Sequence, residues 1–288
     1  MHASEFVYTA LLKPRILRRA ANAVIKFLLP KTVTVGDAII WINPNDPVVS
    51  GALRFRVYER SEISFFRSRL MSDMTLIDVG ANVGLYTGVA LSTKGFNGVV
   101  LALEPHRESR EFLQRTIASN RVTNQQGKVI VSDVAASDRA GSATFYKNSQ
   151  NKGDNRIYPD PLLDEEEVIA TDTLDNICQQ HGIDSVQFLK IDVQGAEAKV
   201  VGGAARLLQR SADCIVMTEF WPYGLSRSGS DALAYLESLG RLGFRLYELR
   251  SGSILPLDSP RALISKTQGR NYANLIGLKG KFCENRAQ

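Results

Sequence analysis

The chain has 288 residues, of which 44% are hydrophobic and 23% charged, so it can bury a large core and is not a disordered protein. Its formal net charge of +5 at pH 7 is typical of a solvated surface, and no nucleic-acid partner is expected. No apolar run approaches the roughly 18 residues that a membrane-spanning helix needs.

The cysteines and histidines are few and scattered. Cys178, Cys214 and Cys283 lie far apart, and no pair has the C-x-x-C spacing of a zinc or redox site. The three histidines are equally dispersed, so a His/Cys zinc centre is not expected. An odd number of cysteines and the lack of a signal peptide favour a reducing compartment, and therefore a cytoplasmic protein.

Residues 1–73 are predicted to form an N-terminal extension, because they lack the strand–helix alternation of the rest of the chain. Residues 4–29 have the spacing of an amphipathic helix with a basic face. This helix either packs on the domain with its basic face in water, the favoured interpretation, or makes a peripheral contact with an anionic membrane. Short strands are predicted at 32–35 and 38–42, and a helix at 59–71.

Residues 74–288 are predicted to form one α/β domain. Apolar strand segments alternate with helical segments, which is typical of a doubly wound, mostly parallel sheet covered by helices on both faces. The predicted strands are 76–79, 99–103, 129–134, 186–191, 213–218, 244–248 and 272–278. The predicted helices are 85–94, 107–119, 173–180, 196–209 and 231–239.

One stretch breaks this alternation. Residues 143–147 are predicted to form a hairpin strand, and the polar residues 148–167 that follow are predicted to form a long loop near the mouth of the site. Long loops inside compact domains are commonly functional.

The strongest chemical signal is the segment LIDVGANVG, residues 76–84, in which an apolar strand runs into a tight turn before a helix. Gly80 and Gly84 allow the backbone to turn and approach a ligand, and Asn82 tolerates a positive φ. A dinucleotide fingerprint would need glycines where Asn82 and Leu85 stand, so an NAD-binding loop fits poorly. Asp78 suits a ligand that carries a cationic amine, as S-adenosylmethionine does. The remaining alternative is a purely structural turn.

Two acids end the next two strands. Glu104 lies about twenty residues beyond the glycine loop, where a carboxylate can accept both hydrogen bonds of a ribose diol. Asp133 ends the third strand, where it could accept from an adenine amino group or simply cap a loop.

The segment FLKIDVQGAE, residues 188–197, ends a further strand at Asp192. Glu219 ends the neighbouring predicted strand, so the two carboxylates could activate a hydroxyl group or hold a divalent ion such as magnesium. Capping of loops is an equally good interpretation of both acids. Glu197 lies in a first helical turn, where a negative charge is favourable in any case.

Together, the segments IDVGANVGLYT, EP, ASDRAG and LKIDVQGAE, in this order, resemble the FkbM family of methyltransferases. The resemblance covers roughly residues 75–219. It implies a seven-stranded methyltransferase sheet, S-adenosylmethionine as methyl donor and a sugar or polyketide hydroxyl as acceptor. By this resemblance Asp78, Gly80 and Asn82 would line the methionine end, Glu104 the ribose and Asp133 the adenine.

The sequence therefore predicts an S-adenosylmethionine-dependent methyltransferase that methylates a hydroxyl on a sugar, glycan or polyketide-type acceptor. Its donor site would comprise Asp78, Gly80, Asn82, Gly84, Glu104 and Asp133. Asp192 and Glu219 are the candidates for proton transfer, with or without magnesium. The alternatives are an NAD-dependent oxidoreductase and a non-catalytic adenosylmethionine-binding module.

Overall fold

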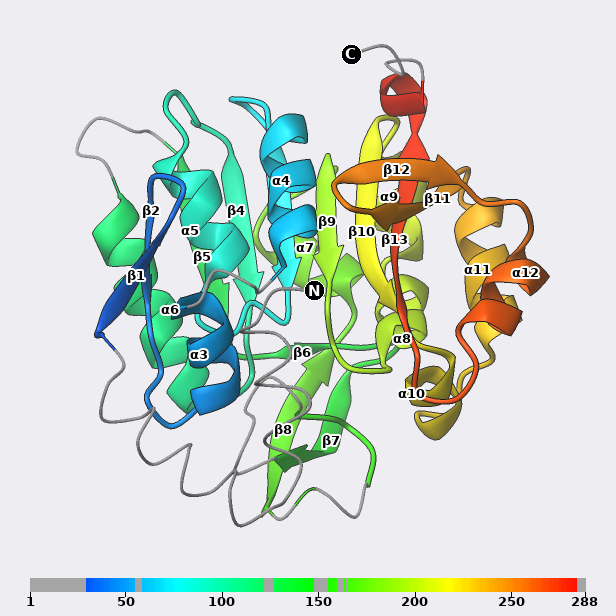
Figure 1. Cartoon of the computed structure of the whole chain (residues 1–288), viewed down its shortest axis with the longest axis horizontal. Helices are drawn as coiled ribbons and strands as arrows, with labels where there is room; N and C mark the ends of the chain where they lie inside the picture. The colour runs from blue at the N-terminus through cyan, green and yellow to red at the C-terminus, as the bar shows by residue number, and fades with distance from the viewer. Residues whose placement is uncertain are drawn as a thin grey trace.

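The computed structural model describes residues 30–54, 59–121, 127–147, 155–159, 163 and 165–283, with only the backbone of Pro47 and Val48. Its centre is an eight-stranded sheet in the order β12-β11-β13-β10-β9-β3-β4-β5 (Figure 1). The strands are β3 (Thr75–Val79), β4 (Val99–Leu103), β5 (Lys128–Ser132), β9 (Phe188–Ile191), β10 (Cys214–Phe220), β11 (Arg245–Arg250), β12 (Ser253–Pro256) and β13 (Ala273–Lys279). All seven predicted strands are present, and the doubly wound α/β fold is confirmed.

The direction of the strands places a ligand site. Strands β5, β4, β3, β9 and β10 are parallel, whereas β13 runs antiparallel between β10 and β11. From β3 the chain winds outward through β4 to β5, and it then returns to the other side of β3 as β9. The point between β3 and β9 is a topological switch point, where open α/β sheets bind ligands at the carboxyl ends of the strands.

Helices cover both faces of the sheet. One face packs against α4 (Arg60–Arg69), α5 (Leu85–Ser92) and α6 (Arg107–Asn120). The other face packs against α7 (Leu174–Gln180), α8 (Glu197–Gly202), α9 (Ala205–Arg210), α10 (Pro222–Arg227), α11 (Ala232–Arg241) and α12 (Pro260–Lys266). Side-chain caps explain where three of these helices begin, because Thr173, Asp231 and Ser259 each accept the backbone N–H three residues on.

The N-terminal part shares the core of the main domain. The two predicted short strands are β1 (Thr32–Val35) and β2 (Ala38–Trp41), and they pair as an antiparallel hairpin beside α5 and α6 (Figure 1). The Asn120 side chain accepts the N–H of Ile39 at 2.8 Å and donates to the Ile39 carbonyl at 2.7 Å. Helix α3 (Pro47–Arg54) follows the hairpin, and the predicted helix at 59–71 is α4. The predicted basic helix at 4–29 lies outside the described residues.

A small second sheet lies at the carboxyl end of the main one. Strands β6 (Ala135–Ala136), β8 (Glu165–Asp172) and β7 (Gly141–Lys147) form it in that order. The predicted hairpin strand is thus β7, and its partner β8 begins inside the stretch predicted as a loop. In that stretch, residues 155–157 line the pocket described below.

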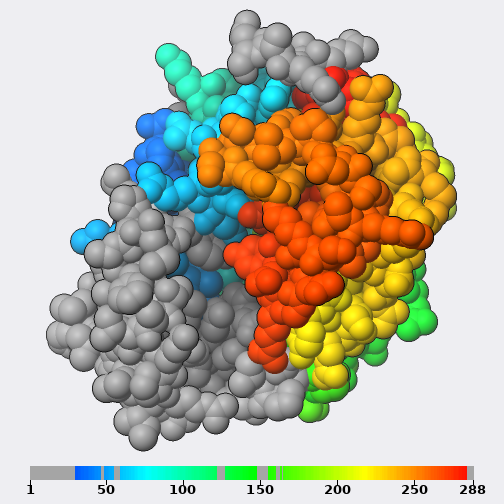
Figure 2. Space-filling view, turned by 45° about the vertical axis from the view of Figure 1, so that its right-hand side comes forward, coloured from blue at the N-terminus to red at the C-terminus, as the bar shows by residue number. Residues whose placement is uncertain are grey.

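The structure corrects the prediction at the helix of residues 196–209, which is two helices, α8 and α9. The break falls at Gly203 and Ala204, and position 203 admits only glycine because a Cβ there would collide with the backbone carbonyl of Ser137. The main sheet also has an eighth strand, β12, which pairs with the edge of β11. In Figure 2 this β11–β12 hairpin (orange) lies against α4 (cyan).

Within the described part of the chain, no helix has the length and apolarity needed to span a bilayer. A short 3-10 helix, Gly280–Cys283, ends the described chain after β13.

Candidate active site

An open pocket lies at the switch point of the sheet. Its walls come from the loop after β3, the ends of β4 and β9, helix α3 and the small sheet. Its polar side chains include Glu59, Asn82, Glu104, Arg156, Lys190 and Asp192.

The loop after β3 has the backbone that its sequence predicts. Gly80, Asn82 and Gly84 have φ of 74°, 48° and 88°, all in the left-handed region. A Cβ on Gly80 would collide with the backbone carbonyl oxygen of Asp192, so only glycine fits there. Gly80 and Asn82 line the pocket, whereas Gly84 faces Leu113 and shapes the turn without lining it.

Asp78 lies beneath this loop and does not line the pocket. Its side chain is fully buried, and Thr87 Oγ1 donates to its Oδ2 at 2.8 Å. Lys190, its neighbour in the register of β3 and β9, places Nζ 3.5 Å from Asp78 Oδ1. The structure therefore places Asp78 under the loop, while its predicted contact with the donor stays a prediction.

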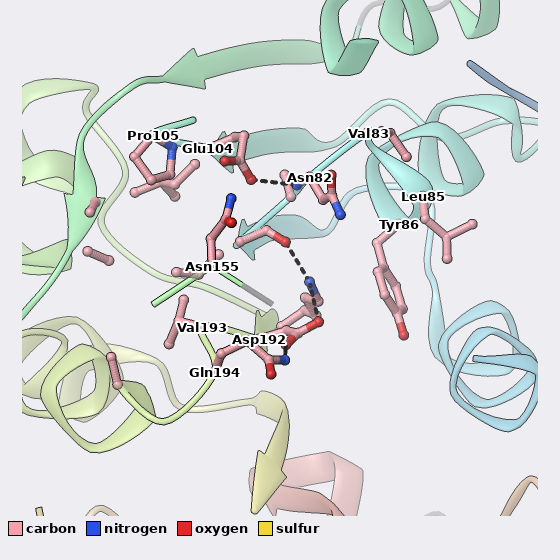
Figure 3. Close-up of a pocket in the computed structure, with 18 of the residues that line it drawn as sticks. Asn82, Val83, Leu85, Tyr86, Glu104, Pro105, Asn155, Asp192, Val193 and Gln194 are labelled. Carbon is pink, nitrogen blue, oxygen red and sulfur yellow. Dashed lines mark hydrogen bonds and ion pairs between the residues drawn. The ribbon is translucent and has the colours of Figure 1, made fainter. Parts of the chain in front are cut away.

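Lys190 joins the two central strands of the site. Its Nζ donates to the Gly80 carbonyl at 2.9 Å and lies 3.8 Å from Asp192 Oδ2 (Figure 3). Burial lowers the pKa of Lys190, but the attraction of Asp78, Asp192 and Glu59 outweighs burial and raises the pKa above its ordinary value. The ammonium therefore stays charged and fixes the glycine loop against β9.

Glu104 ends β4 inside the pocket with its side chain turned toward the loop (Figure 3). Its Oε2 accepts the N–H of Asn82 at 2.8 Å, and its Oε1 accepts the N–H of His106 at 2.9 Å. Burial raises the pKa of Glu104 to about 7, although the two backbone N–H groups lower it in part. Each carboxylate oxygen keeps a second lone pair with which it can accept from a ligand.

Asp133 follows β5 and is not among the residues that line the pocket. Its side chain is 70% exposed, and its Oδ2 lies 3.8 Å from Arg110 Nη2. Arg110 also donates to the carbonyls of Glu104 and Pro105. Asp133 therefore faces the arginine that holds this turn, and its predicted contact with adenine rests on the sequence alone.

Asp192 lines the pocket at the end of β9 (Figure 3). Besides its ion pair with Lys190, it accepts from Gln194 Nε2 at 2.8 Å. The turn that follows is held by buried Glu197, whose Oε1 accepts the N–H of Gly195 at 3.0 Å and of Val193 at 3.3 Å. Glu197 therefore fixes the turn that positions Asp192.

Glu219 lies on β10, one residue beyond the Thr218–Ile191 pair that joins β10 to β9. It is not among the pocket-lining residues, although both Glu219 and Asp192 raise the pKa of Tyr272, which burial raises most. Among the described residues, no group of three or more His, Cys, Asp or Glu is arranged to hold a metal ion. The predicted magnesium site thus has no support in the described part of the chain.

Three charged pocket residues were not predicted from the sequence: Lys190, Glu59 and Arg156. Lys190 had a signal, because it is the one charged residue in the buried strand FLKI. Arg156 is buried and lies over the rings of Tyr158 and Trp221. Glu59 and Arg156 come from segments with no recognisable motif, and only the folded chain brings them to the pocket.

Comparison with solved structures gives distant likenesses. The methyltransferase FkbM from Methylobacillus flagellatus is 17% identical with a TM-score of 0.47, and the match covers 92% of this chain and 60% of that one. A TehB-like SAM-dependent methyltransferase from Corynebacterium glutamicum is 14% identical with a TM-score of 0.41, over 80% of this chain and 97% of that one. M. jannaschii TYW2, in complex with AdoMet, is 9% identical with a TM-score of 0.43, and the match covers 86% of this chain and 84% of that one.

This chain thus spans about 60% of the length of the M. flagellatus protein. A comparison with curated proteins gave no match. The model of the methyltransferase FkbM domain matches residues 78–246, which is more than half of the 288-residue chain and contains both the glycine loop and Asp192. The chain belongs to the FkbM methyltransferase family.

Proposed function

We propose that this chain transfers a methyl group from S-adenosylmethionine to a hydroxyl on a sugar, glycan or polyketide-type acceptor. The observation that carries the proposal is the pocket at the switch point, where Gly80 and Asn82 border it and Glu104 is anchored beside them. The family match supports methyl transfer as the reaction.

The residues of the pocket fit the donor. Asn82 Oδ1 is buried without a hydrogen-bond partner among the described residues, so it is free to accept from a ligand amine or hydroxyl. The Glu104 carboxylate suits the two hydroxyl groups of a ribose. The positive φ of Gly80 brings bare backbone to the pocket wall.

In this proposal the chain works mainly by positioning. Methyl transfer from a sulfonium has a good leaving group, so alignment of the acceptor oxygen with the methyl carbon supplies much of the rate. Asp192 lines the pocket as a carboxylate paired with Lys190, and we assign it the role of orienting the acceptor hydroxyl by accepting its hydrogen bond. Glu219, outside the pocket lining, has no role in this proposal.

Methyl transfer can be tested directly with radiolabelled S-adenosylmethionine. Purified protein would be incubated with separate pools of monosaccharides, lipid-linked glycans and polyketide alcohols, and each product separated from free donor. The proposal predicts label in one hydroxyl-bearing pool and none with Gly80→Val protein. Label only on nitrogen or carbon would contradict the hydroxyl acceptor, and binding of donor without transfer to any pool would favour a non-catalytic module.

A further inference from the structure

Glu59 is a pocket residue that the proposed function leaves without a role. It stands directly before α4, in the N-terminal part of the chain, and lines the pocket together with Val49 and Leu53 of α3. It lies outside residues 78–246, which the family model matches. The N-terminal part therefore contributes a wall and a carboxylate to the same pocket as the glycine loop.

The backbone of Glu59 is unusual for its residue type. Its φ of 45° and ψ of 38° are left-handed, a conformation that glycine and asparagine adopt far more readily than glutamate. The Glu59 carbonyl accepts the N–H of Ile63 at 2.9 Å, which fixes this residue at the start of α4. Strained non-glycine residues of this kind concentrate at functional sites.

One oxygen of the Glu59 carboxylate is not used by the fold. Its Oε2 is buried and has no hydrogen-bond partner among the described residues. Burial, together with the nearby charges of Asp192 and Glu62, raises the pKa of Glu59 to about 7, although Lys190 and a hydrogen bond from the Tyr86 hydroxyl lower it in part. These groups come from β9, α4 and α5, the elements packed around it.

Asp192 has a different set of contacts. Its carboxylate already has an ammonium partner in Lys190 and a hydrogen-bond donor in Gln194. Within the described part of the chain Glu59 Oε2 has neither, so its lone pairs are available to accept the proton of an acceptor hydroxyl. Of the two carboxylates, Glu59 is therefore the one that the fold leaves available for proton transfer.

We propose that Glu59 is the general base of the methyl transfer, so that the N-terminal part of the chain completes the active site; this inference rests on the proposed function. The Glu59 carboxylate takes the proton of the acceptor hydroxyl as the acceptor oxygen forms its bond to the methyl carbon. The carbon–sulfur bond breaks, its electron pair stays on sulfur, and the products are the methyl ether, S-adenosylhomocysteine and protonated Glu59. Proton acceptance by a positioned carboxylate is an ordinary role in catalysis.

A binding experiment tests the position of Glu59 without knowledge of the acceptor. S-Adenosylmethionine differs from S-adenosylhomocysteine by one methyl group and the sulfonium charge that it creates, and only the charge responds to the ionisation of a nearby carboxylate. If Glu59 faces the sulfonium, the ratio of their calorimetric affinities shifts toward S-adenosylmethionine by about tenfold between about pH 5.5 and 8.5, as Glu59 ionises. Glu59→Gln should remove most of this shift and leave only the contribution of Glu104, whose pKa is also raised to about 7. The matched control Glu237→Gln, at an exposed position on α11 outside the pocket, should keep the wild-type profile.

A rate measurement tests the proton transfer itself, with the acceptor that the labelled-donor assay identifies. Wild-type kcat/KM should rise with pH to a plateau above about 7, because the base must be ionised. Glu59→Gln should lower kcat by about 10²–10⁴-fold and remove this rise. Glu59→Asp, a residue that tolerates the left-handed backbone, should keep the rise with a reduced rate and serves if the glutamine variant does not fold.

The outcomes separate the two proposals. Failure of both nucleosides to bind any variant would refute the proposed function. Binding of both with a wild-type ratio that does not change with pH would overturn the role of Glu59 alone. That role would also be overturned if folded Glu59→Gln protein kept the wild-type ratio profile, or if its kcat were unchanged.

Discussion

The buried ammonium of Lys190 has three partners at the site. It lies 3.5 Å from one Asp78 oxygen, 3.8 Å from an Asp192 oxygen and donates to the Gly80 carbonyl. Removing one member of a buried ion pair leaves the other charge without compensation, which costs more than the pair itself contributes.

Lys190→Met should therefore destabilise the protein by about 3–5 kcal/mol, since it leaves the fully buried Asp78 unpaired. Urea unfolding followed by circular dichroism would measure this loss. The exposed Lys94 provides the control, and Lys94→Met should change the free energy of unfolding by less than about 0.5 kcal/mol. The double variant Asp78→Asn/Lys190→Met should recover part of the lost free energy of unfolding. Equal effects of Lys190→Met and Lys94→Met on this free energy would refute the stabilising role of the ion pairs around Lys190.

The buried carboxyl group of Glu197 should make the free energy of unfolding depend on pH. Burial raises the pKa of Glu197 to about 7, so between its ordinary value near 4.5 and this value the folded chain binds more protons than the unfolded chain. The free energy of unfolding must therefore fall as pH rises through this window, by at most about 3 kcal/mol for this group, and level off above it.

Glu197→Gln keeps the acceptor for the Gly195 and Val193 N–H groups but cannot ionise. Urea unfolding at a series of pH values should show a shallower fall for this variant than for the wild-type protein. Identical slopes in the two proteins would mean that Glu197 ionises in the folded state as readily as in the unfolded chain.

At the scale of elements, the β3–α5 loop depends on a close approach to β9. Gly80 and Gly95 both have positive φ, at 74° and 81°, but only at Gly80 would a Cβ meet another backbone, that of Asp192. A Cβ on Gly95 would meet nothing within 4 Å. The two glycines separate the cost of backbone conformation from the cost of collision.

Gly95→Ala should destabilise by about 1 kcal/mol, the usual strain of a left-handed alanine, and leave S-adenosylhomocysteine binding unchanged. Gly80→Ala should weaken the affinity for S-adenosylhomocysteine by at least about tenfold, because the loop must move away from Asp192 to admit the Cβ. Calorimetric titration of both variants with S-adenosylhomocysteine would measure these affinities, and circular dichroism would confirm that each variant is folded. Tight binding by Gly80→Ala protein would show that the loop can accept a Cβ without losing the donor site.

The strands of the main sheet were predictable because each is an apolar run followed by a turn signal. Only β12 was missed, since it is a four-residue edge strand whose residues are mostly exposed. Strand β8 was missed because its first three residues are glutamates and Val168 on it is 75% exposed. In both strands, exposure to solvent removes the hydrophobic pattern that burial would impose.

Three short helices, α3, α10 and α12, had no predicted counterpart because six to eight residues are too few to show a helical period. Each begins with proline, at Pro47, Pro222 and Pro260, and proline is favoured in the first turn. Ser259 and Asp46 also cap two of them. This information was present in the sequence, in the residues at the helix starts.

Some residues of the candidate site could also be placed from the sequence, and others could not. Gly80, Asn82 and Glu104 could be placed from the sequence, because each follows directly from a strand end in a parallel sheet. Glu59 could not, because its position depends on how the N-terminal part folds back over α5. The position of Asp192 at a strand end could be predicted, but its ion pair with Lys190 depends on the packing of two strands.

At the scale of the whole molecule, the pocket gathers segments from the N-terminal part, the glycine loop, the small sheet and the turn after β9. The N-terminal part shares one hydrophobic core with α5 and α6, so the pocket and the fold form together. A ligand in this pocket is therefore surrounded by segments from all of these parts, and its binding should raise the free energy of unfolding of the whole chain.

Everything proposed for this pocket depends on the identity of its ligand, which calorimetric titration of the dialysed protein with S-adenosylhomocysteine and with NAD would establish. We predict saturable binding of S-adenosylhomocysteine and none of NAD. Glu104→Ala should weaken binding by at least about tenfold while the protein stays folded, because the ribose hydroxyls lose their charged acceptor. Binding of NAD in place of S-adenosylhomocysteine, or unchanged affinity in folded Glu104→Ala protein, would contradict a donor site built on the glycine loop and Glu104.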